Sequence, residues 1–169
     1  SDILKEASKP YHPLEIAYRF LLSEGITTLS LGASKPNDFE LAIKLANSTQ
    51  KLSRLEIDVI TNIENESNKR LGITKCEQCR ACLPCPSEVP IPEILRLRNM
   101  YIGNGQEEFA KERYNLIGRA GHWWETKNAH NCMSCNFCLP KCPNKLDIPS
   151  LLKETHHLLL DKPKRRLWG

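Results

Sequence analysis

The first third of the chain shows apolar residues in a helix–strand–helix order. Apolar positions recur at helical spacing over residues 14–23, with Pro13 at the favoured first position and Gly25 just after the end. Residues 26–31 are apolar and β-branched, which predicts a buried strand. Residues 37–47 then predict a second helix. This order is typical of one turn of a parallel α/β fold.

The remaining residues carry helical patterns separated by loops. A long helix is predicted from Ser53, which is a good N-terminal cap, to the stop signal at Gly72. Further helices are expected over about 92–101, 106–117 and 149–160. The first and last of these open with an Ile-Pro pair, and proline suits a first helical turn. The fold class predicted for most of the chain is therefore mainly α.

All 8 cysteines lie in two short runs between these helices. The second run has the bacterial iron–sulfur spacing C-x2-C-x2-C-x3-C-P, and the first is the same run with one residue missing before its fourth cysteine. Such a loop can place three thiolates on three corners of a cubane cluster. The two runs are Cys76, Cys79, Cys82, Cys85 and Cys132, Cys135, Cys138, Cys142.

The spacing predicts two [4Fe–4S] clusters with crossed ligands. In two-cluster ferredoxins the fourth cysteine, which precedes proline, ligates the other cluster. The first cluster is therefore expected to be held by Cys76, Cys79, Cys82 and Cys142. The second is expected to be held by Cys132, Cys135, Cys138 and Cys85.

The segments after the two runs repeat each other. Residues 85–95 and 142–152 share the pattern C-P-x-x-apolar-x-I-P-x-apolar-L. We interpret this as an internal repeat of one structural unit, in which a cysteine loop is followed by a Cys-Pro turn and a helix. Two such units related by a pseudo-twofold axis would exchange their fourth ligands.

Two other interpretations of the cysteines remain open. They could form four disulfides, although the pairs recur very tightly for a disulfide framework. They could also hold two zinc ions with four thiolates each, although zinc ribbons usually space two pairs widely. We interpret His130, His156 and His157 as surface or core residues, since four thiolates per cluster are already available.

Composition and charge limit the cellular compartments and the partners that are expected for this chain. The net charge is +4, and much of it comes from a basic tail over residues 162–166, which could be a solvated end or a docking segment for an acidic partner. No apolar run is long enough to span a membrane, and no signal peptide is visible. Thiolate ligands need reducing conditions until metal protects them, so we expect a cytoplasmic location. No nucleic-acid partner is expected.

Charged and aromatic residues near the motifs could tune or shield a cluster. Lys75, Arg80, Lys141 and Lys145 stand beside the cysteines, where positive charge would favour the reduced cluster. Trp123, Trp124 and Tyr114 could either shield a cluster or fill a core.

Two resemblances follow from these residues. The stretch Pro13-Leu-Glu-Ile-Ala-Tyr-Arg-Phe-Leu-Leu, followed by Thr27-Thr-Leu-Ser-Leu-Gly-Ala-Ser34, resembles the end of an aldo/keto reductase (β/α)8 barrel. The long helical spacer between the motifs resembles the α-helical type of two-cluster ferredoxin domain, as in succinate dehydrogenase. The whole arrangement, with its shortened first motif, is similar to the C-terminal part of aldo/keto reductase-like oxidoreductases that carry a fused ferredoxin domain.

The barrel resemblance implies a cofactor loop and a partner. In that family the loop after the last strand helps to hold the adenosine phosphate of NADP, which implies a role for Gly32, Ala33, Ser34 and Lys35. NADP would bind only together with a complete barrel. The catalytic residues of that family lie on earlier strands, so no catalytic residue is expected in this chain. The expected partner is the rest of such a barrel or another redox protein.

These expectations divide the chain into four parts. Residues 1–52 would be the helix–strand–helix remnant of the barrel, 53–72 a connecting helix, 73–160 the cluster domain and 161–169 the basic tail. The expected function is electron transfer within an aldo/keto reductase-like oxidoreductase. The alternatives are a stand-alone ferredoxin-like carrier and a structural metal-binding domain without a redox role.

Overall fold

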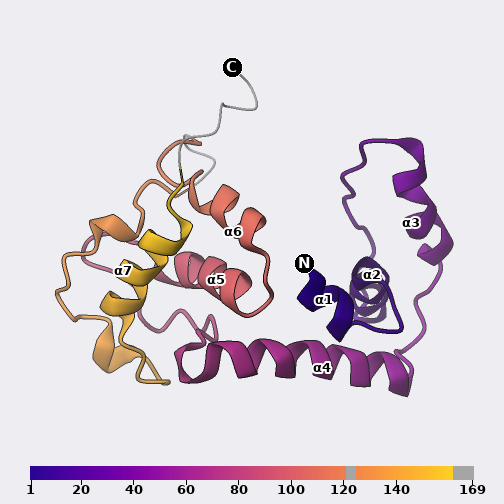
Figure 1. Cartoon of the computed structure of the whole chain (residues 1–169), viewed down its shortest axis with the longest axis horizontal. Coiled ribbons are helices and arrows are strands. Elements are labelled where there is room, and N and C mark those ends of the chain that lie inside the picture. The colour runs from indigo at the N-terminus through magenta and orange to yellow at the C-terminus, as the bar shows by residue number, and fades with distance from the viewer. Residues whose placement is uncertain (121–124, 162–169) are drawn as a thin grey trace. The chain divides into compact units, whose positions relative to one another are not determined.

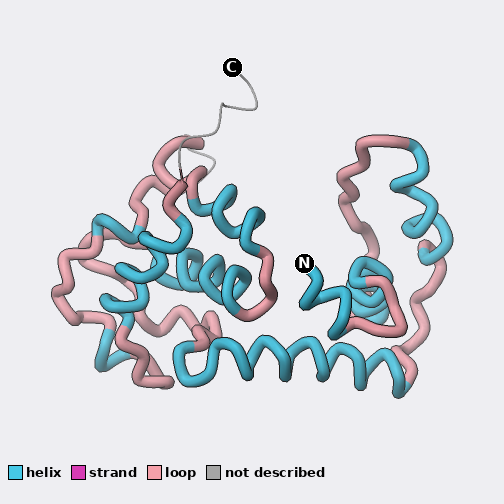
Figure 2. Tube along the Cα trace, in the orientation of Figure 1, coloured by secondary structure: helices cyan, strands magenta, loops and turns pink. Residues whose placement is uncertain are grey.

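The computed structural model describes residues 1–120 and 125–161, which form helices joined by loops. No strand is present in these two ranges (Figure 2). The chain divides into two compact units, Ser1–Glu66 and Ser67–Gly169, and the long helix α4 (Arg54–Leu71) passes from one into the other (Figure 1). The basic tail over 162–169 and the residues 121–124 lie outside the described residues, so the tail assigned to 161–169 is described only at Asp161.

The first unit contains four helical segments before α4. They are α1 (Asp2–Ala7), α2 (Pro13–Ser23), a 3₁₀ turn (Pro36–Phe39) and α3 (Glu40–Leu45). The predicted helices over 14–23 and 37–47 are thus observed, the second as a 3₁₀ turn that continues into a short α-helix. The α1 helix was not predicted, because residues 1–12 carry no apolar periodicity.

A buried polar cluster holds α2 against the start of α4. The Arg19 Nε lies 2.7 Å from Glu56 Oε1, and Arg19 also donates to the backbone carbonyls of Ser48 and Lys51. Glu56 accepts a 2.6 Å hydrogen bond from the Ser53 amide, while the Ser53 hydroxyl accepts from the Glu56 amide at 3.2 Å. This is a capping box, so the N-terminal cap predicted at Ser53 is confirmed.

The strand predicted over residues 26–31 is wrong. These residues form a loop, because a strand needs a neighbouring strand to accept and donate its backbone hydrogen bonds, and the described residues offer none. The segment for which a helix–strand–helix order was expected is therefore a helix, an irregular segment and a helix. The side chains of Thr27, Leu29 and Leu31 instead line an apolar hollow together with Tyr18, Leu22, Ala42, Leu45 and Ala46.

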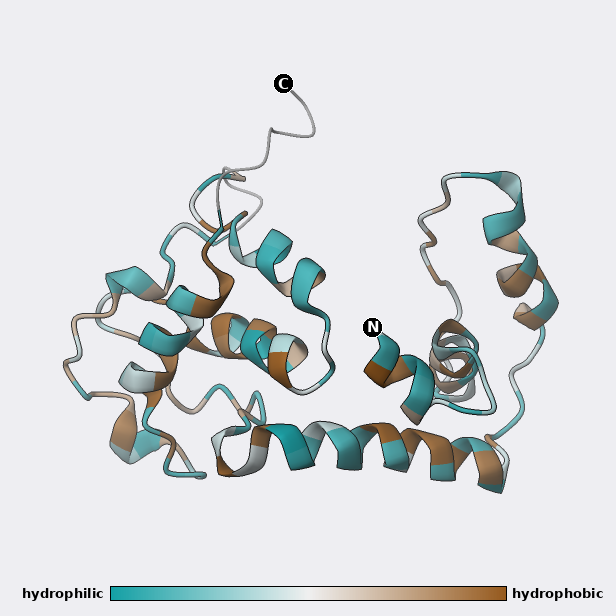
Figure 3. Cartoon of the chain, in the orientation of Figure 1, coloured by the Kyte–Doolittle hydropathy of each residue, from teal (hydrophilic) through white to brown (hydrophobic). Residues whose placement is uncertain are grey.

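The α4 helix changes character along its length. The predicted helix from Ser53 to Gly72 is observed at Arg54–Leu71. Figure 3 shows its apolar residues gathered in the N-terminal half, whereas the C-terminal half is polar. The helix ends where Gly72 takes a left-handed φ of 51°, which glycine adopts at little cost.

The second unit is a small three-helix core around two long loops. It contains α5 (Ile91–Ile102), α6 (Glu107–Tyr114) and α7 (Ile148–Leu159), which pack against one another. The predicted helices over 92–101, 106–117 and 149–160 are therefore observed. The best-buried side chains of this core are Ile91, Ile94, Leu95, Tyr114, Ile148, Leu152 and Leu159.

Candidate metal centre

Both cysteine loops contain left-handed residues at the same places. Among residues 1–120 and 125–161, six residues other than glycine have a positive φ, and they form three equivalent pairs in the two loops. Such a φ is strained for most side chains, so its recurrence at matching positions shows that the two loops follow one backbone path. The pairs are Gln78 with Ser134, Arg80 with Asn136, and Glu88 with Lys145.

Backbone hydrogen bonds repeat in the same way. The amide of Leu83 donates to Arg80 and that of Leu139 to Asn136, both at 3.0 Å. Beyond the fourth cysteine of each run, the Glu88 amide donates to the Cys85 carbonyl at 2.9 Å and the Lys145 amide donates to the Cys142 carbonyl at 3.1 Å. The second run has one residue more than the first, between its third and fourth cysteines. At this place the first loop has a cis Leu83-Pro84 bond, and the second has a 3₁₀ turn at Leu139–Lys141. The α5 and α7 helices that follow each contain 12 residues.

The structure brings cysteines of both runs together. Cys76, Cys79 and Cys82 line one hollow with Cys142 of the second run, and the apolar side chains of Pro92, Leu95, Leu146 and Ile148 line it as well. Besides burial, the charges of Cys132, Cys135 and Cys85 raise the pKa of the Cys138 thiol, and the charge of Cys138 is among those that raise that of Cys82. The assignment of four cysteines to each cluster stays a prediction.

Burial makes the free thiols reluctant to ionise. Burial is the main cause that raises the pKa of Cys82 to about 11, and it also raises the pKa values of Cys76 and Cys138. Neighbouring cysteines add to each increase, because several thiolates close together repel one another. A metal centre must therefore displace the protons and supply positive charge if these sulfurs are to be thiolates at neutral pH.

The donor set fits iron–sulfur clusters. Within the described ranges, no three Cys, His, Asp or Glu side chains converge as the ligands of one metal ion do. In a cubane cluster each thiolate binds its own iron atom, so its four sulfur ligands stand farther apart. The eight cysteines of the two loops suit clusters of this kind.

Polar contacts fix the first loop to the helices. Asn99 of α5 accepts from the Cys76 amide at 3.4 Å and donates to the Cys76 carbonyl at 2.8 Å. The buried Arg98 binds Thr74, just before the loop, and forms an ion pair with Glu154 of α7 at 3.0 Å. These contacts were not found in the sequence, because Arg98 and Asn99 are far from the cysteines along the chain and belong to no motif.

Tyr114 is the centre of a second polar network. Its hydroxyl lies 2.6 Å from His156 Nδ1 and accepts from the Ala129 amide at 3.3 Å, three residues before Cys132. Burial raises the pKa of Tyr114 to about 12 and lowers that of His156, to which His130 and His157 also contribute. When both groups are neutral, the Tyr114 hydroxyl can donate to His156 Nδ1 in the tautomer whose proton is on Nε2. Of the three aromatic residues singled out in the sequence, Tyr114 fills the core, while Trp123 and Trp124 lie outside the described residues.

The four loop residues implied for NADP lie in the first unit. Gly32, Ala33, Ser34 and Lys35 lie on the surface, and the amides of Ser34 and Lys35 donate to Asp38 Oδ2 at 2.9 and 3.1 Å. The two amides therefore already bind a carboxylate of the chain itself. The role of these residues in NADP binding stays a prediction.

Comparison with known proteins identifies the second unit. A family model described as a 4Fe-4S dicluster domain matches residues 75–147, so a domain of this kind is present in the chain. The match covers both cysteine runs and the helical spacer, and it supports an iron–sulfur electron-transfer role. No curated protein and no solved structure matches the chain. In the part of the chain that the structure describes, no helix has the length and hydrophobicity needed to cross a membrane.

Proposed function

We propose that this chain transfers single electrons through two [4Fe–4S] clusters. The observation that carries the proposal is the doubled loop, with three cysteines of the first run and the fourth of the second lining one hollow. The first cluster would be held by Cys76, Cys79, Cys82 and Cys142, and the second by Cys132, Cys135, Cys138 and Cys85. When bound, such clusters accept and release one electron each at potentials set by their surroundings.

The residues of the chain would hold, shield and tune the two clusters. Apolar side chains of α5 and of the segment before α7 line the first hollow and would exclude water from it. The Gln78 side-chain amide donates to Cys76 Sγ at 3.3 Å, and such a hydrogen bond stabilises negative charge on the sulfur. The exposed Cys79 and Cys135 lie at the surface, where an electron could enter or leave each cluster.

Metal analysis under anaerobic conditions tests this proposal. Reconstituted protein should contain about eight irons and eight sulfides per chain, be brown, and lose absorbance on reduction. The reduced protein should give an electron paramagnetic resonance signal that disappears on reoxidation. A colourless protein with two zinc ions would contradict the proposal, and clusters without a reversible redox signal would indicate a purely structural role.

Single replacements test the crossed ligation. Cys142→Ser should damage the cluster held by the first loop and spare the one held by the second loop, and Cys85→Ser should do the reverse. Cys79→Ser and Cys135→Ser serve as matched controls that assign each spectrum. If Cys142→Ser and Cys135→Ser abolish the same signal while the Cys79 cluster survives both, each loop binds its own cluster and the crossing is wrong.

We further propose that residues 1–52 are the end of an aldo/keto reductase-like barrel that exchanges electrons with the clusters. The support is the resemblance of residues 13–34 to that family, and α2 and α3 lie where its two helices are expected, although the strand between them is not formed in this chain. The loop over residues 32–35 would then meet the adenosine phosphate of NADP. Titration of a complete oxidoreductase that contains this chain with 2′,5′-ADP tests this loop: Asp38→Asn should strengthen binding, because it removes a carboxylate that competes with phosphate for two amides. Equal, negligible binding by both forms would contradict the assignment.

A further inference from the structure

The two cysteine loops share a backbone but differ in surface chemistry. At equivalent positions the first loop has Glu77 and the second Met133, and Glu88 in the first is replaced by Lys145 in the second. No Asp or Glu occurs between residues 126 and 146, whereas the first loop carries charges of both signs. Since the shared backbone path demands neither set of side chains, this difference needs another explanation.

The charges of the first loop are largely neutralised within the unit. Arg80 forms a 2.7 Å ion pair with Glu93, and Glu77 forms one with Lys75 at 3.3 Å. Glu88 lies 3.6 Å from Lys127, which precedes the second loop. Charges that are paired in this way produce little field at a distance, so the surface around Cys79 offers an approaching protein no net charge of either sign.

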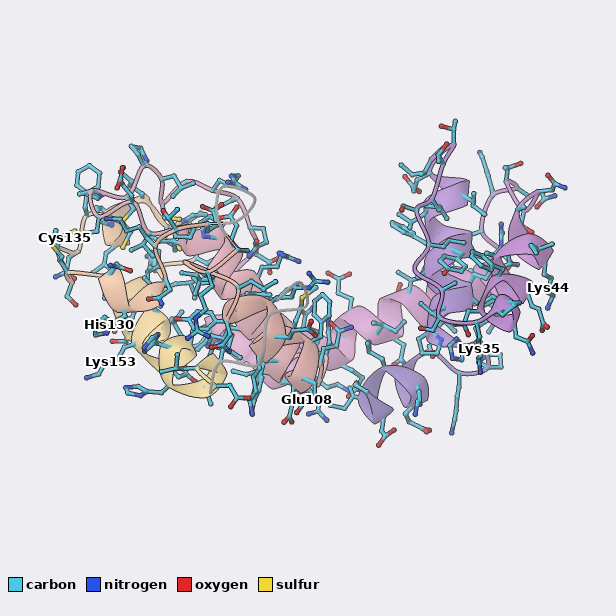
Figure 4. The ribbon with its side chains drawn as sticks, turned by 90° about the horizontal axis from the view of Figure 1, so that it is seen from above. Lys35, Lys44, Glu108, His130, Cys135 and Lys153 are labelled. Atoms are coloured by element: carbon cyan, nitrogen blue, oxygen red, sulfur yellow. The ribbon has the colours of Figure 1, made fainter. Side chains whose placement is uncertain are left out.

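The second loop presents an apolar centre with cations beside it. Met133 is 70% exposed and Phe137 49% exposed, on either side of the exposed Cys135. The Lys141 Nζ lies 3.9 Å from the centre of the Phe137 ring. Neither Lys141 nor Lys145 forms an ion pair with a carboxylate of the described residues. Figure 4 places Cys135 at the outer rim of this unit, where another protein can reach it.

We propose that Met133, Cys135, Phe137, Lys141 and Lys145, here called the second-motif edge, form the docking surface for an acidic redox protein. This proposal rests on the proposed function and names the kind of partner. Two exposed apolar side chains give the contact its desolvated centre, and the two lysines attract and orient an acidic surface. An acidic partner is favoured over a basic one because the edge contains cations and no carboxylate.

Electrons and protons balance in the transfer through this surface when the partner carries a flavin that accepts one electron. The residues Cys132, Cys135, Cys138 and Cys85 would hold the cluster that supplies one electron and would thereby return to its oxidised state. The electron enters the oxidised flavin of the partner, and one proton from solvent completes the neutral flavin semiquinone. The reductant that prepares the chain in the experiment is dithionite, which is removed before mixing.

An acidic flavodoxin serves as the probe, in stopped-flow mixing with the full chain carrying both clusters. Lys141→Gln/Lys145→Gln should lower the second-order rate of electron transfer roughly tenfold at low ionic strength, because electrostatic steering is lost. The difference should shrink at about 0.5 M salt, where exposed charges are screened. Arg96→Gln/Lys153→Gln is the matched control, since it removes two exposed cations elsewhere in the unit and should change the rate less than about twofold.

Two further measurements separate docking from redox competence. A small neutral quinone should oxidise the wild type and both variants at equal rates, because it needs no charged docking surface. If the quinone reaction is normal but Lys141→Gln/Lys145→Gln leaves the flavodoxin rate unchanged, or the control lowers it as much, docking at the second-motif edge is wrong. A faster reaction with basic cytochrome c than with flavodoxin at low salt, after allowing for driving force, would also overturn it. Clusters that cannot be reduced at all would overturn the proposed function, and the docking with it.

Discussion

The two units of this chain achieve order by different means. The first unit buries only a few apolar side chains among the described residues, and large ones such as Phe20, Phe39 and Ile43 stay exposed. Its organisation depends on one buried ion pair between Arg19 and Glu56. The second unit has a continuous apolar core, yet the described residues of its two long cysteine loops contain no regular structure beyond short 3₁₀ turns. The comparison teaches that one unit is stabilised by side chains alone, whereas the other is completed by a cofactor.

Removal of the clusters should have the largest effect and should act on the second unit alone. The two loops are then no longer held together by bonds from their cysteines to the clusters. The free energy of metal binding therefore no longer contributes to the free energy of folding. Chelation under reducing conditions should unfold about residues 74–155 while leaving much of α4 helical. Hydrogen exchange followed residue by residue measures this, with the amides of α2 as the internal reference. An apo-protein that keeps its full helicity and a sharp thermal transition would show that the metal does not hold the fold.

Glu56→Gln should act on the first unit alone. The Arg19 guanidinium is the main reason that the pKa of Glu56 is lowered to about 2, so the ion pair stabilises the unit fully above about pH 4.5 and is lost as the pH falls toward 2. Its loss leaves Arg19 buried and unpaired, which we expect to cost about 2–3 kcal/mol at pH 7. Exchange of the α2 amides should accelerate while that of α5 stays unchanged. Asp58→Asn, in the exposed pair with Arg54, is the matched control and should have little effect.

Gly103→Ala should destabilise the second unit even when both clusters are bound. A methyl group at Gly103 would lie 2.7 Å from the Asn99 carbonyl and 2.8 Å from a methyl of Leu71, and the backbone can yield only by shifting. We expect a cost of about 1–3 kcal/mol, visible as a lower thermal midpoint of the cluster-loaded protein. Gly32→Ala, where the added methyl group meets nothing within 4 Å, is the control. Equal midpoints for both variants would show that this packing is not tight.

Tyr114→Phe should have the smallest effect, because it keeps the buried ring and removes only the hydroxyl. The Ala129 amide and His156 each lose a hydrogen-bond partner, at a cost of about 1 kcal/mol. The pKa of His156 should rise toward its ordinary value, since a donor to the neutral imidazole is gone. Nuclear magnetic resonance titration of His156 measures this, with Tyr101→Phe as the control. An unchanged titration would indicate that the hydroxyl does not donate to this histidine.

The sequence was sufficient to predict the elements that depend on local patterns. The α5 and α7 helices follow from the repeated Ile-Pro start and apolar spacing, and α4 from the cap at Ser53. The two cysteine runs were recognised by their spacing, and the family match over residues 75–147 agrees with that interpretation. In each case the information lies within a short stretch of chain, so no tertiary contact is needed to interpret it.

The sequence failed where the outcome depends on distant residues. Residues 26–31 have the composition of a strand, but strand formation depends on a neighbour that apolar periodicity does not reveal. The pairing of Arg19 with Glu56 and of Arg98 with Glu154 likewise joins residues from separate helices. The left-handed conformation of Gln78 and Ser134 was not foreseen either, because neither residue is a glycine and the loop path alone requires it.

The hollow that combines Cys82 with Cys142 has a consequence for how the protein is made. About sixty residues of chain separate these two cysteines, so during synthesis the first loop leaves the ribosome well before its fourth partner. At 5–20 residues per second the delay is roughly 3–12 s. During this interval three closely spaced thiols are available to stray metal ions and oxidants. If Cys142 is the fourth ligand, as we propose, insertion of a cluster at this hollow must wait for the second loop, and the nascent chain would depend on reducing conditions until then.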